Sequence, residues 1–154
     1  MKKTLYVDMD GVLVDFQSGI DRLTDEERAE FAGNEDDCPR IFELMEPMEG
    51  AIEGFTELAK HFDIYILSTS PWKNPNAPAH KLAWVKKHFG DGPESPAYKR
   101  LILSHHKNLN EGDFIIDDRK KHGVETFGER HIHYQTDPRF PDWKSMVDHL
   151  IPLA

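Results

Sequence analysis

The stretch TLYVDMDGVLVDF, residues 4–16, decides the fold and raises the question of function. Its first four residues are strand formers, and they lead directly into two carboxylates, Asp8 and Asp10. Gly11 follows at once, and glycine lets a chain turn sharply close to a ligand. A third acid, Asp15, stands behind a second apolar run. Paired negative charges at the tip of a segment that is otherwise typical of buried core indicate a site.

Short apolar runs and amphipathic segments alternate along the rest of the chain. Apolar residues at helical spacing predict helices over 50–62, 80–90 and 142–150, and the second of these has Leu82, Val85 and Phe89 on its apolar face. Strands that alternate with helices indicate an α/β protein with an open, mostly parallel, Rossmann-like sheet and helices on both faces. The predicted strands are TLYV (4–7), IYILS (64–68), LILS (101–104), FII (114–116) and HIHY (131–134).

Residues 17–46 interrupt this alternation. TDEE (24–27) has the capping-box pattern and predicts the start of a short helix. CPRIFELM (38–45), with a proline in its first turn, predicts a second one. We interpret residues 17–46 as a small helical cap insertion over the sheet, and residues 1–154 as one domain.

The composition limits the range of partners. The chain has 154 residues and a formal net charge of −9, which argues against binding of a nucleic-acid polymer. No run is long enough to span a membrane, and no apolar segment typical of a signal peptide precedes Asp8. A lone cysteine, Cys38, excludes an internal disulfide framework and fits a reducing compartment, so a cytosolic location is expected. The sequence does not indicate the oligomeric state.

Polar side chains follow four of the predicted strands at the point where each strand ends. Because ligands bind at the carboxyl ends of parallel strands, these side chains are expected to share one crevice. Together they offer four carboxylates, two hydroxyls and one ammonium group. They are Asp8 and Asp10, then Thr69 and Ser70, then Lys107, and finally Asp117 and Asp118.

Four carboxylates in one crevice need a cation. Two like charges about 4 Å apart repel by roughly 4 kcal/mol at an effective dielectric constant of about 20. Mg²⁺ prefers carboxylate oxygens and retained waters, so it is the expected cofactor. Such a site also accepts a phosphoryl oxygen, while Lys107 and the Thr69 hydroxyl hold the others. One carboxylate would then attack phosphorus, and the other would protonate the leaving oxygen.

The residues DMDGVL (8–13) match the DxDGxL signature of the haloacid dehalogenase superfamily of phosphotransferases. In addition, DMDGVLVDF, STSP, AWVKKHFG, IIDDR and DWK resemble, in this order, segments of the 5′(3′)-deoxyribonucleotidases. The resemblance implies a haloacid dehalogenase-like fold. It also implies Mg²⁺-dependent hydrolysis of nucleoside monophosphates, with deoxyribonucleotides as the preferred class, through an aspartyl-phosphate intermediate.

The resemblance also implies roles for individual residues. Asp8 is the nucleophile and a magnesium ligand, and Asp10 is the general acid/base and offers its backbone carbonyl to the metal. Asp118 is the direct metal ligand of the second acidic pair, and Asp117 supports the site. The phosphate is bound by Thr69, Ser70 and Lys107, and the nucleoside is contacted by Phe16.

The insertion departs from the pattern of this family, because it is short and contains no tryptophan. Its only aromatic residues are Phe31 and Phe42. Two alternatives therefore stay open: a phosphatase for another small phosphomonoester, such as a sugar phosphate, and a non-catalytic phosphate-binding protein of the same fold. Trp72 is expected at the rim of the site, after STSP.

Two histidine pairs raise the question of a second metal. They are His105 with His106 and His131 with His133. A transition-metal site needs three or four converging ligands, and the sequence shows no such convergence.

Overall fold

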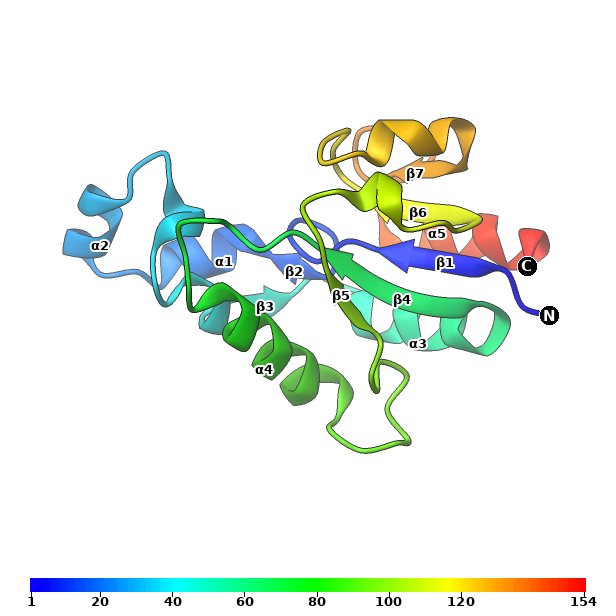
Figure 1. Cartoon of the computed structure of the whole chain (residues 1–154), viewed down its shortest axis with the longest axis horizontal. Helices are drawn as coiled ribbons and strands as arrows, with labels where there is room; N and C mark the ends of the chain where they lie inside the picture. Colours follow the sequence, from blue (N-terminus) through cyan, green and yellow to red (C-terminus); the bar gives the residue numbers. More distant parts are fainter.

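The computed structural model describes all 154 residues and contains a five-stranded parallel sheet (Figure 1). The strand order is β5-β4-β1-β6-β7, so the strand that leads into Asp8 lies at the centre. This confirms the predicted α/β fold class. The strands are β1 (Thr4–Val7), β4 (Asp63–Ser68), β5 (Leu101–Leu103), β6 (Phe114–Asp117) and β7 (His131–His133).

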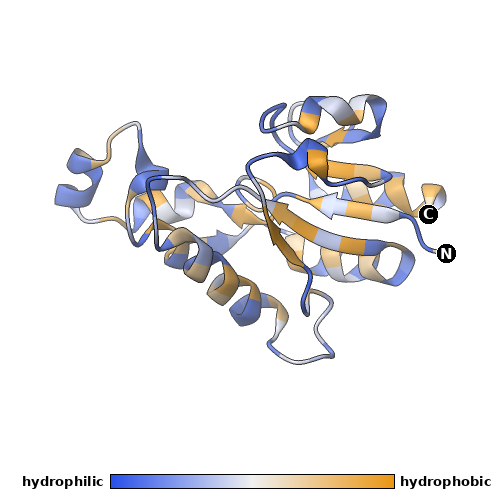
Figure 2. Cartoon of the chain, in the orientation of Figure 1, coloured by the Kyte–Doolittle hydropathy of each residue, from blue (hydrophilic) through white to orange (hydrophobic).

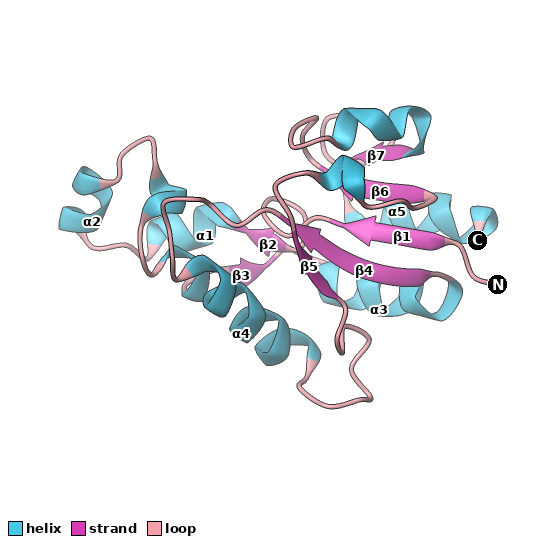
Figure 3. Cartoon of the chain, in the orientation of Figure 1, coloured by secondary structure: helices cyan, strands magenta, loops and turns pink.

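The two faces of the sheet are covered differently. Leu5 and Val7 belong to a large buried core that also includes residues of α3 (Ala51–His61), α4 (Ala77–Phe89) and α5 (Trp143–Leu150). Side chains alternate along a strand, so Tyr6 points to the opposite face, where it packs in a smaller core with Val124 and Phe127. A 3₁₀ segment, Val124–Arg130, therefore covers this second face in place of a regular helix (Figure 3). No helix is long and apolar enough to cross a membrane.

The predicted apolar face of α4 is confirmed for Val85, which is buried, and for Phe89, which packs against the core. It is wrong for Leu82, which is 44% exposed. The buried face instead contains Trp84 and Lys81, whose side chain is 0% exposed. A lysine thus occupies a buried position that hydropathy alone assigns to solvent.

The insertion is more varied than predicted. Two short strands, β2 (Val14–Asp15) and β3 (Glu46–Pro47), pair at its base. Helix α1 (Phe16–Asp21) was not predicted, and the Asp15 carboxylate caps it by accepting a bond from Ser18 N. Thus the third acid of the opening stretch has a structural role. Helix α2 (Asp25–Glu30) starts with the predicted capping box.

The predicted helix over 38–45 is wrong, because this segment forms only a 3₁₀ turn at Ile41–Glu43. Side chains from the body of the protein bind the backbone carbonyls around it. The Asn74 amide donates to Asp36 O and Cys38 O, and the Trp84 indole donates to Met45 O. With these carbonyls satisfied from outside, the segment does not need the hydrogen bonds of a continuous helix.

The strand directions place the insertion over the candidate site. The carboxyl ends of β1 and β4 point toward α1 and α2, and both chain termini lie at the other end of the molecule (Figure 1). The hydropathy colouring shows apolar strands in the sheet and a hydrophilic α2 at the outer end of the insertion (Figure 2).

Candidate active site

Asp8, the first residue after β1, lies in a buried ion-pair network. Its Oδ1 accepts a bond from Lys107 Nζ at 2.9 Å, and Lys107 Nζ also donates to Asp117 Oδ2 at 2.7 Å. Asp8, Lys107 and Asp117 are each at least nine-tenths buried. Burial raises the pKa of Asp8, and the nearby Lys107 opposes this rise. An ammonium group has three protons, so one proton of Lys107 stays available for another acceptor.

Asp118 is the acid whose carboxylate oxygens are most free to bind an ion. Its Oδ1 is buried and has no hydrogen-bond partner. Burial, and then the charges of Asp8 and Asp117, raise the pKa of Asp118 to about 7. Gly11 allows this carboxylate to approach, because a Cβ at position 11 would collide with it, and the φ of +79° at Gly11 suits glycine. The glycine of the opening motif thus makes room for an acid that follows β6.

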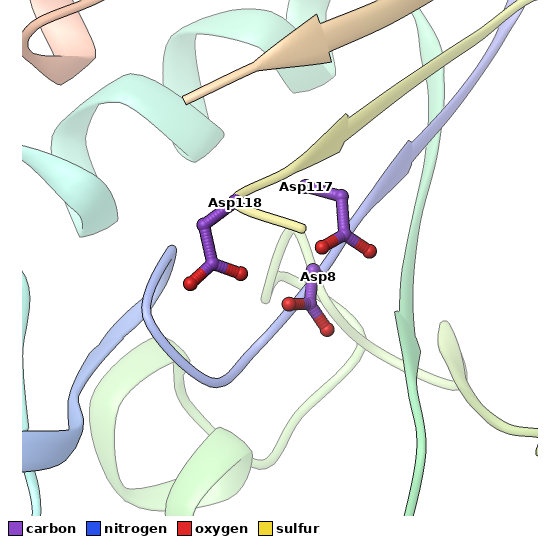
Figure 4. Close-up of side chains that lie close together, drawn as sticks. All are labelled: Asp8, Asp117 and Asp118. Atoms are coloured by element: carbon purple, nitrogen blue, oxygen red, sulfur yellow. The ribbon is translucent and has the colours of Figure 1, made fainter. Parts of the chain in front are cut away.

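The three acids form one cluster. Ligand oxygens of Asp8, Asp117 and Asp118 lie within 4.8 Å of one another, and the close-up shows the three carboxylates converging (Figure 4). Asp117 already accepts bonds from Lys107 and from Arg119 N. Asp8 and Asp118 are therefore the carboxylates with oxygens left for an ion. An all-oxygen donor set, a raised pKa and an orphaned buried oxygen fit a hard divalent cation.

Asp10 stands beside this cluster and bonds to a residue that the sequence did not single out. Lys81 of α4 donates to Asp10 Oδ2 at 3.0 Å, to Ser68 Oγ at 2.7 Å and to Thr69 O at 3.1 Å. Burial raises the pKa of Asp10, and Lys81 opposes the rise. Asp10 Oδ1 has no partner. The carboxyl group is thus held from one side and keeps a free oxygen that can exchange a proton.

The two hydroxyls after β4 differ in their availability. Thr69 Oγ1 donates its proton to Ser104 O at 2.8 Å. Ser70 Oγ is buried without a hydrogen-bond partner, and the residue Ser70 is one of those that line the large cavity of the site. Ser70 therefore has the free donor, while Thr69 contributes to the shape of the wall.

A cavity of about 670 Å³ opens over these groups. Asp10, Gly11, Ser70 and Asp118 line it, and so does Phe16, whose contact with a nucleoside stays a prediction. The two aromatic residues of the insertion do not line it. Phe42 is buried with its ring 6.1 Å from the Phe16 ring, and Phe31 packs on the main core. The remaining wall is formed by residues 34–37, Thr69, 71–73, His105, Arg119 and His122.

The two histidines of β7 bind the backbone next to the acidic cluster. His131 Nε2 bonds to Asp117 O at 2.9 Å, and His133 Nε2 bonds to Asp118 O at 3.0 Å. The two rings stack with centroids 4.6 Å apart. They thus hold the backbone of the acidic pair, and they lie outside the one cluster of three potential ligands.

Comparison with known proteins agrees with this geometry. Residues 34–140 match the family described as 5′ nucleotidase, deoxy (Pyrimidine), cytosolic type C protein. The chain belongs to this nucleotidase family. A protein of Vibrio phage KVP40, provisionally named as a 5′(3′)-deoxyribonucleotidase, is 55% identical over 149 residues, which cover 97% of this chain and 85% of that protein. A protein of Bordetella pertussis with the same provisional name is 33% identical over 174 residues, covering 92% and 91% of the two chains.

A solved structure supports the fold of this nucleotidase family member. The HAD-hydrolase YfnB from Bacillus subtilis, whose structure is described as bound to magnesium, has a TM-score of 0.56 and 16% identity. The similarity covers 89% of this chain and 90% of that one. It confirms the haloacid dehalogenase-like fold. Membership in the nucleotidase family confirms the predicted enzyme class, a phosphoric monoester hydrolase.

Proposed function

We propose that this protein is a Mg²⁺-dependent phosphatase that hydrolyses nucleoside monophosphates, with deoxyribonucleotides as the preferred class, through an aspartyl-phosphate intermediate. One observation carries the proposal. The buried Asp8 carboxylate is held between Lys107 and the acids Asp117 and Asp118, next to a cavity of about 670 Å³. Two relatives provisionally named as deoxyribonucleotidases support the substrate class.

In the first step a carboxylate oxygen of Asp8 forms a bond to phosphorus, and the ester P–O bond breaks. Oδ1 accepts a bond from Lys107 and keeps a second lone pair for the ion, so Oδ2 is the oxygen left for attack. The leaving sugar oxygen takes a proton from Asp10. The raised pKa of Asp10 favours the protonated form that this step needs.

In the second step water attacks the phosphorus of the aspartyl-phosphate. Asp10, now ionised, accepts a proton from the water, and the bond between the Asp8 oxygen and phosphorus breaks. Inorganic phosphate leaves, and both carboxyl groups return to their starting states. Lys81 supports this cycle because its charge stabilises the ionised form of Asp10 between the two steps.

The non-bridging oxygens of the phosphate need donors. The free proton of Lys107 and the Ser70 hydroxyl supply two, and Thr69 shapes the wall beside them. Mg²⁺ would be held by Asp8 and Asp118, with the backbone carbonyl of Asp10 as the family resemblance implies, while Asp117 supports the site. When bound, it would neutralise charge on the phosphoryl oxygens.

The charge of the cavity wall supports a monophosphate substrate. Glu35, Asp36 and Asp37 of the insertion line the cavity. Additional phosphate groups that extend toward these acids would be repelled. A small substrate and a cytosolic location stay part of the proposal.

A substrate screen tests the proposal directly. We expect kcat/KM with Mg²⁺ to be higher for dUMP, dTMP, dCMP and dGMP than for deoxyribose 5-phosphate, which has the same sugar and phosphate but no base. The Asp8→Asn variant is the control for contaminating phosphatases. A sugar phosphate preferred a hundredfold over every nucleotide would favour the alternative phosphatase. Absence of turnover on all substrates would favour a non-catalytic binding protein.

A further inference from the structure

Trp72 is the most exposed large aromatic residue of the protein. It is 88% exposed, whereas the other two tryptophans, Trp84 and Trp143, are 4% and 1% exposed. Burial and contact with another π system stabilise an indole. An indole that is exposed to water therefore offers a surface for binding. Trp72 also lines the large cavity, where Phe16 is the only other aromatic hydrocarbon ring. The exposed indole therefore lies at the candidate site.

Trp72 is close along the chain to residues that are proposed to bind or surround the phosphate. It follows Thr69, Ser70 and Pro71 without a break. Pro71 fixes one backbone dihedral in this loop, and the Trp72 ring packs edge-to-face with the His105 ring, with centroids 5.8 Å apart and an interplanar angle of 72°. The indole thus belongs to a residue two positions after Ser70, lines the same cavity and is supported on one side by His105.

We propose that Trp72 is the stacking platform for the nucleobase of the substrate. The aromatic residues of the insertion cannot take this role, because Phe42 is buried and Phe31 does not line the cavity. A nucleotide whose phosphate is bound by Ser70 and Lys107 would place its base in the cavity that Trp72 and Phe16 line. This inference rests on the proposed function, and it names the residue that makes the proposed phosphatase prefer a substrate with a base.

The kinetic test uses substrates that differ only in the base. Trp72→Ala is expected to raise KM for dUMP about 5- to 150-fold, the range for loss of one base–aromatic stack, with a smaller change in kcat. The ratio of kcat/KM for dUMP to that for deoxyribose 5-phosphate should fall by the same factor. Trp72→Phe should retain most of this ratio, and Trp72→Leu should lose it, because stacking requires an aromatic ring.

The matched control is Tyr98→Ala. Tyr98 is an exposed aromatic residue, 38% exposed, which lines a groove between α4 and β5 and no part of the site. Its removal should leave the ratio unchanged. If the ratio of kcat/KM for dUMP to that for deoxyribose 5-phosphate is also unchanged in Trp72→Ala, Trp72 is not the stacking platform. The proposed phosphatase activity would not be contradicted by that result.

Fluorescence provides a readout that does not depend on turnover. In the Asp8→Asn variant with Mg²⁺, dUMP should quench the tryptophan emission, and deoxyribose 5-phosphate should not. The quenching should disappear when Trp72→Phe is added, because Trp84 and Trp143 are buried. Binding of dUMP in equilibrium dialysis without quenching would overturn the platform. Failure of the unsubstituted protein to hydrolyse any nucleotide would instead contradict the proposed function.

Discussion

Replacing Lys81 with methionine is expected to weaken both the fold and the catalysis. Methionine keeps an unbranched side chain of similar length and removes the charge. The Lys81 side chain is fully buried, and its three protons go to Asp10 Oδ2, Ser68 Oγ and Thr69 O. The substitution therefore leaves Asp10 without its counterion and Thr69 O without its donor.

The structure allows the magnitude to be estimated. Removal of one partner of a buried ion pair costs about 3–5 kcal/mol. The Asp10 side chain keeps 19% exposure, so water recovers part of its solvation. We therefore expect the lower end, about 3 kcal/mol, which corresponds to a decrease in Tm of roughly 6–12 °C for a chain of this size. We expect kcat to decrease about 10²-fold, the low end for a displaced general acid.

Urea unfolding in excess EDTA measures the stability without a contribution from bound metal. A double-mutant cycle of Lys81→Met with Asp10→Asn isolates the pair. Each single variant leaves one buried polar group without its partner, so the double variant should lose less than the sum, with a coupling of about 1–3 kcal/mol. Lys86→Met on the same helix is the control, because its pairing with Asp91 is exposed and contributes less than about 1 kcal/mol.

Two results together would refute this account of Lys81. They are a coupling below about 0.5 kcal/mol, which is the level found for independent sites, and an unchanged kcat in Lys81→Met. Lys81 would then be a buried residue without influence on Asp10.

The remaining predictions concern the nucleophile, the metal and the insertion. Asp8→Asn should abolish turnover and rapid-quench labelling by ³²P-substrate, because an amide cannot form the acyl phosphate; labelling at the level of the unsubstituted protein would exclude covalent catalysis at Asp8. EDTA should stop hydrolysis, Mg²⁺ should restore it, and Ca²⁺ should restore it poorly because its longer, looser contacts misplace the nucleophile; full activity in EDTA would remove the metal from the mechanism. Glu27→Gln should lower the hydrogen-exchange protection of residues 24–40, since Glu27 accepts two bonds from Arg40 and one from Thr24 N. Arg40 lowers the pKa of Glu27, so protection by this pair should be complete above pH 4.5 and decrease as the pH falls further; equal protection in Glu27→Gln would contradict this role.

The sequence predicted the sheet and most of the acidic site because both depend on local patterns. A buried parallel strand is a short apolar run, and the chemistry follows directly where the run ends. Asp8 and Asp118 could thus be placed near each other without knowledge of any contact. Lys81 could not, because its partner Asp10 is 71 residues away and nothing local distinguishes it from a surface lysine. Its position on the same face as Trp84 and Val85 was the only available signal.

The second predicted helix of the insertion, over 38–45, was wrong for the same physical reason. The segment 38–45 has a helical pattern, but its carbonyls bind the Asn74 amide and the Trp84 indole, which lie far along the chain. Backbone groups that bind side chains elsewhere in the protein do not have to form the helix that the local sequence favours. The two histidines of β7 illustrate this too, since they bind the backbone carbonyls of the acidic pair, which lie on the neighbouring strand.

The burial of Phe42 changes what the short insertion does. Its ring lies 4.6 Å from Lys81 Nζ, in a cation–π contact, and so the insertion packs on the cation that holds Asp10. In the proposed mechanism the insertion therefore acts on the proton donor, whereas Trp72, from the body of the protein, acts on the base. We expect Phe42→Leu, which keeps apolar volume and removes the ring, to lower kcat for dUMP and deoxyribose 5-phosphate by the same factor, with little change in KM. Steady-state kinetics of both substrates measure this, with Trp72→Leu as the counterpart that changes KM for dUMP alone. A Phe42→Leu variant that raises KM for dUMP and leaves kcat intact would instead place Phe42 in the base site.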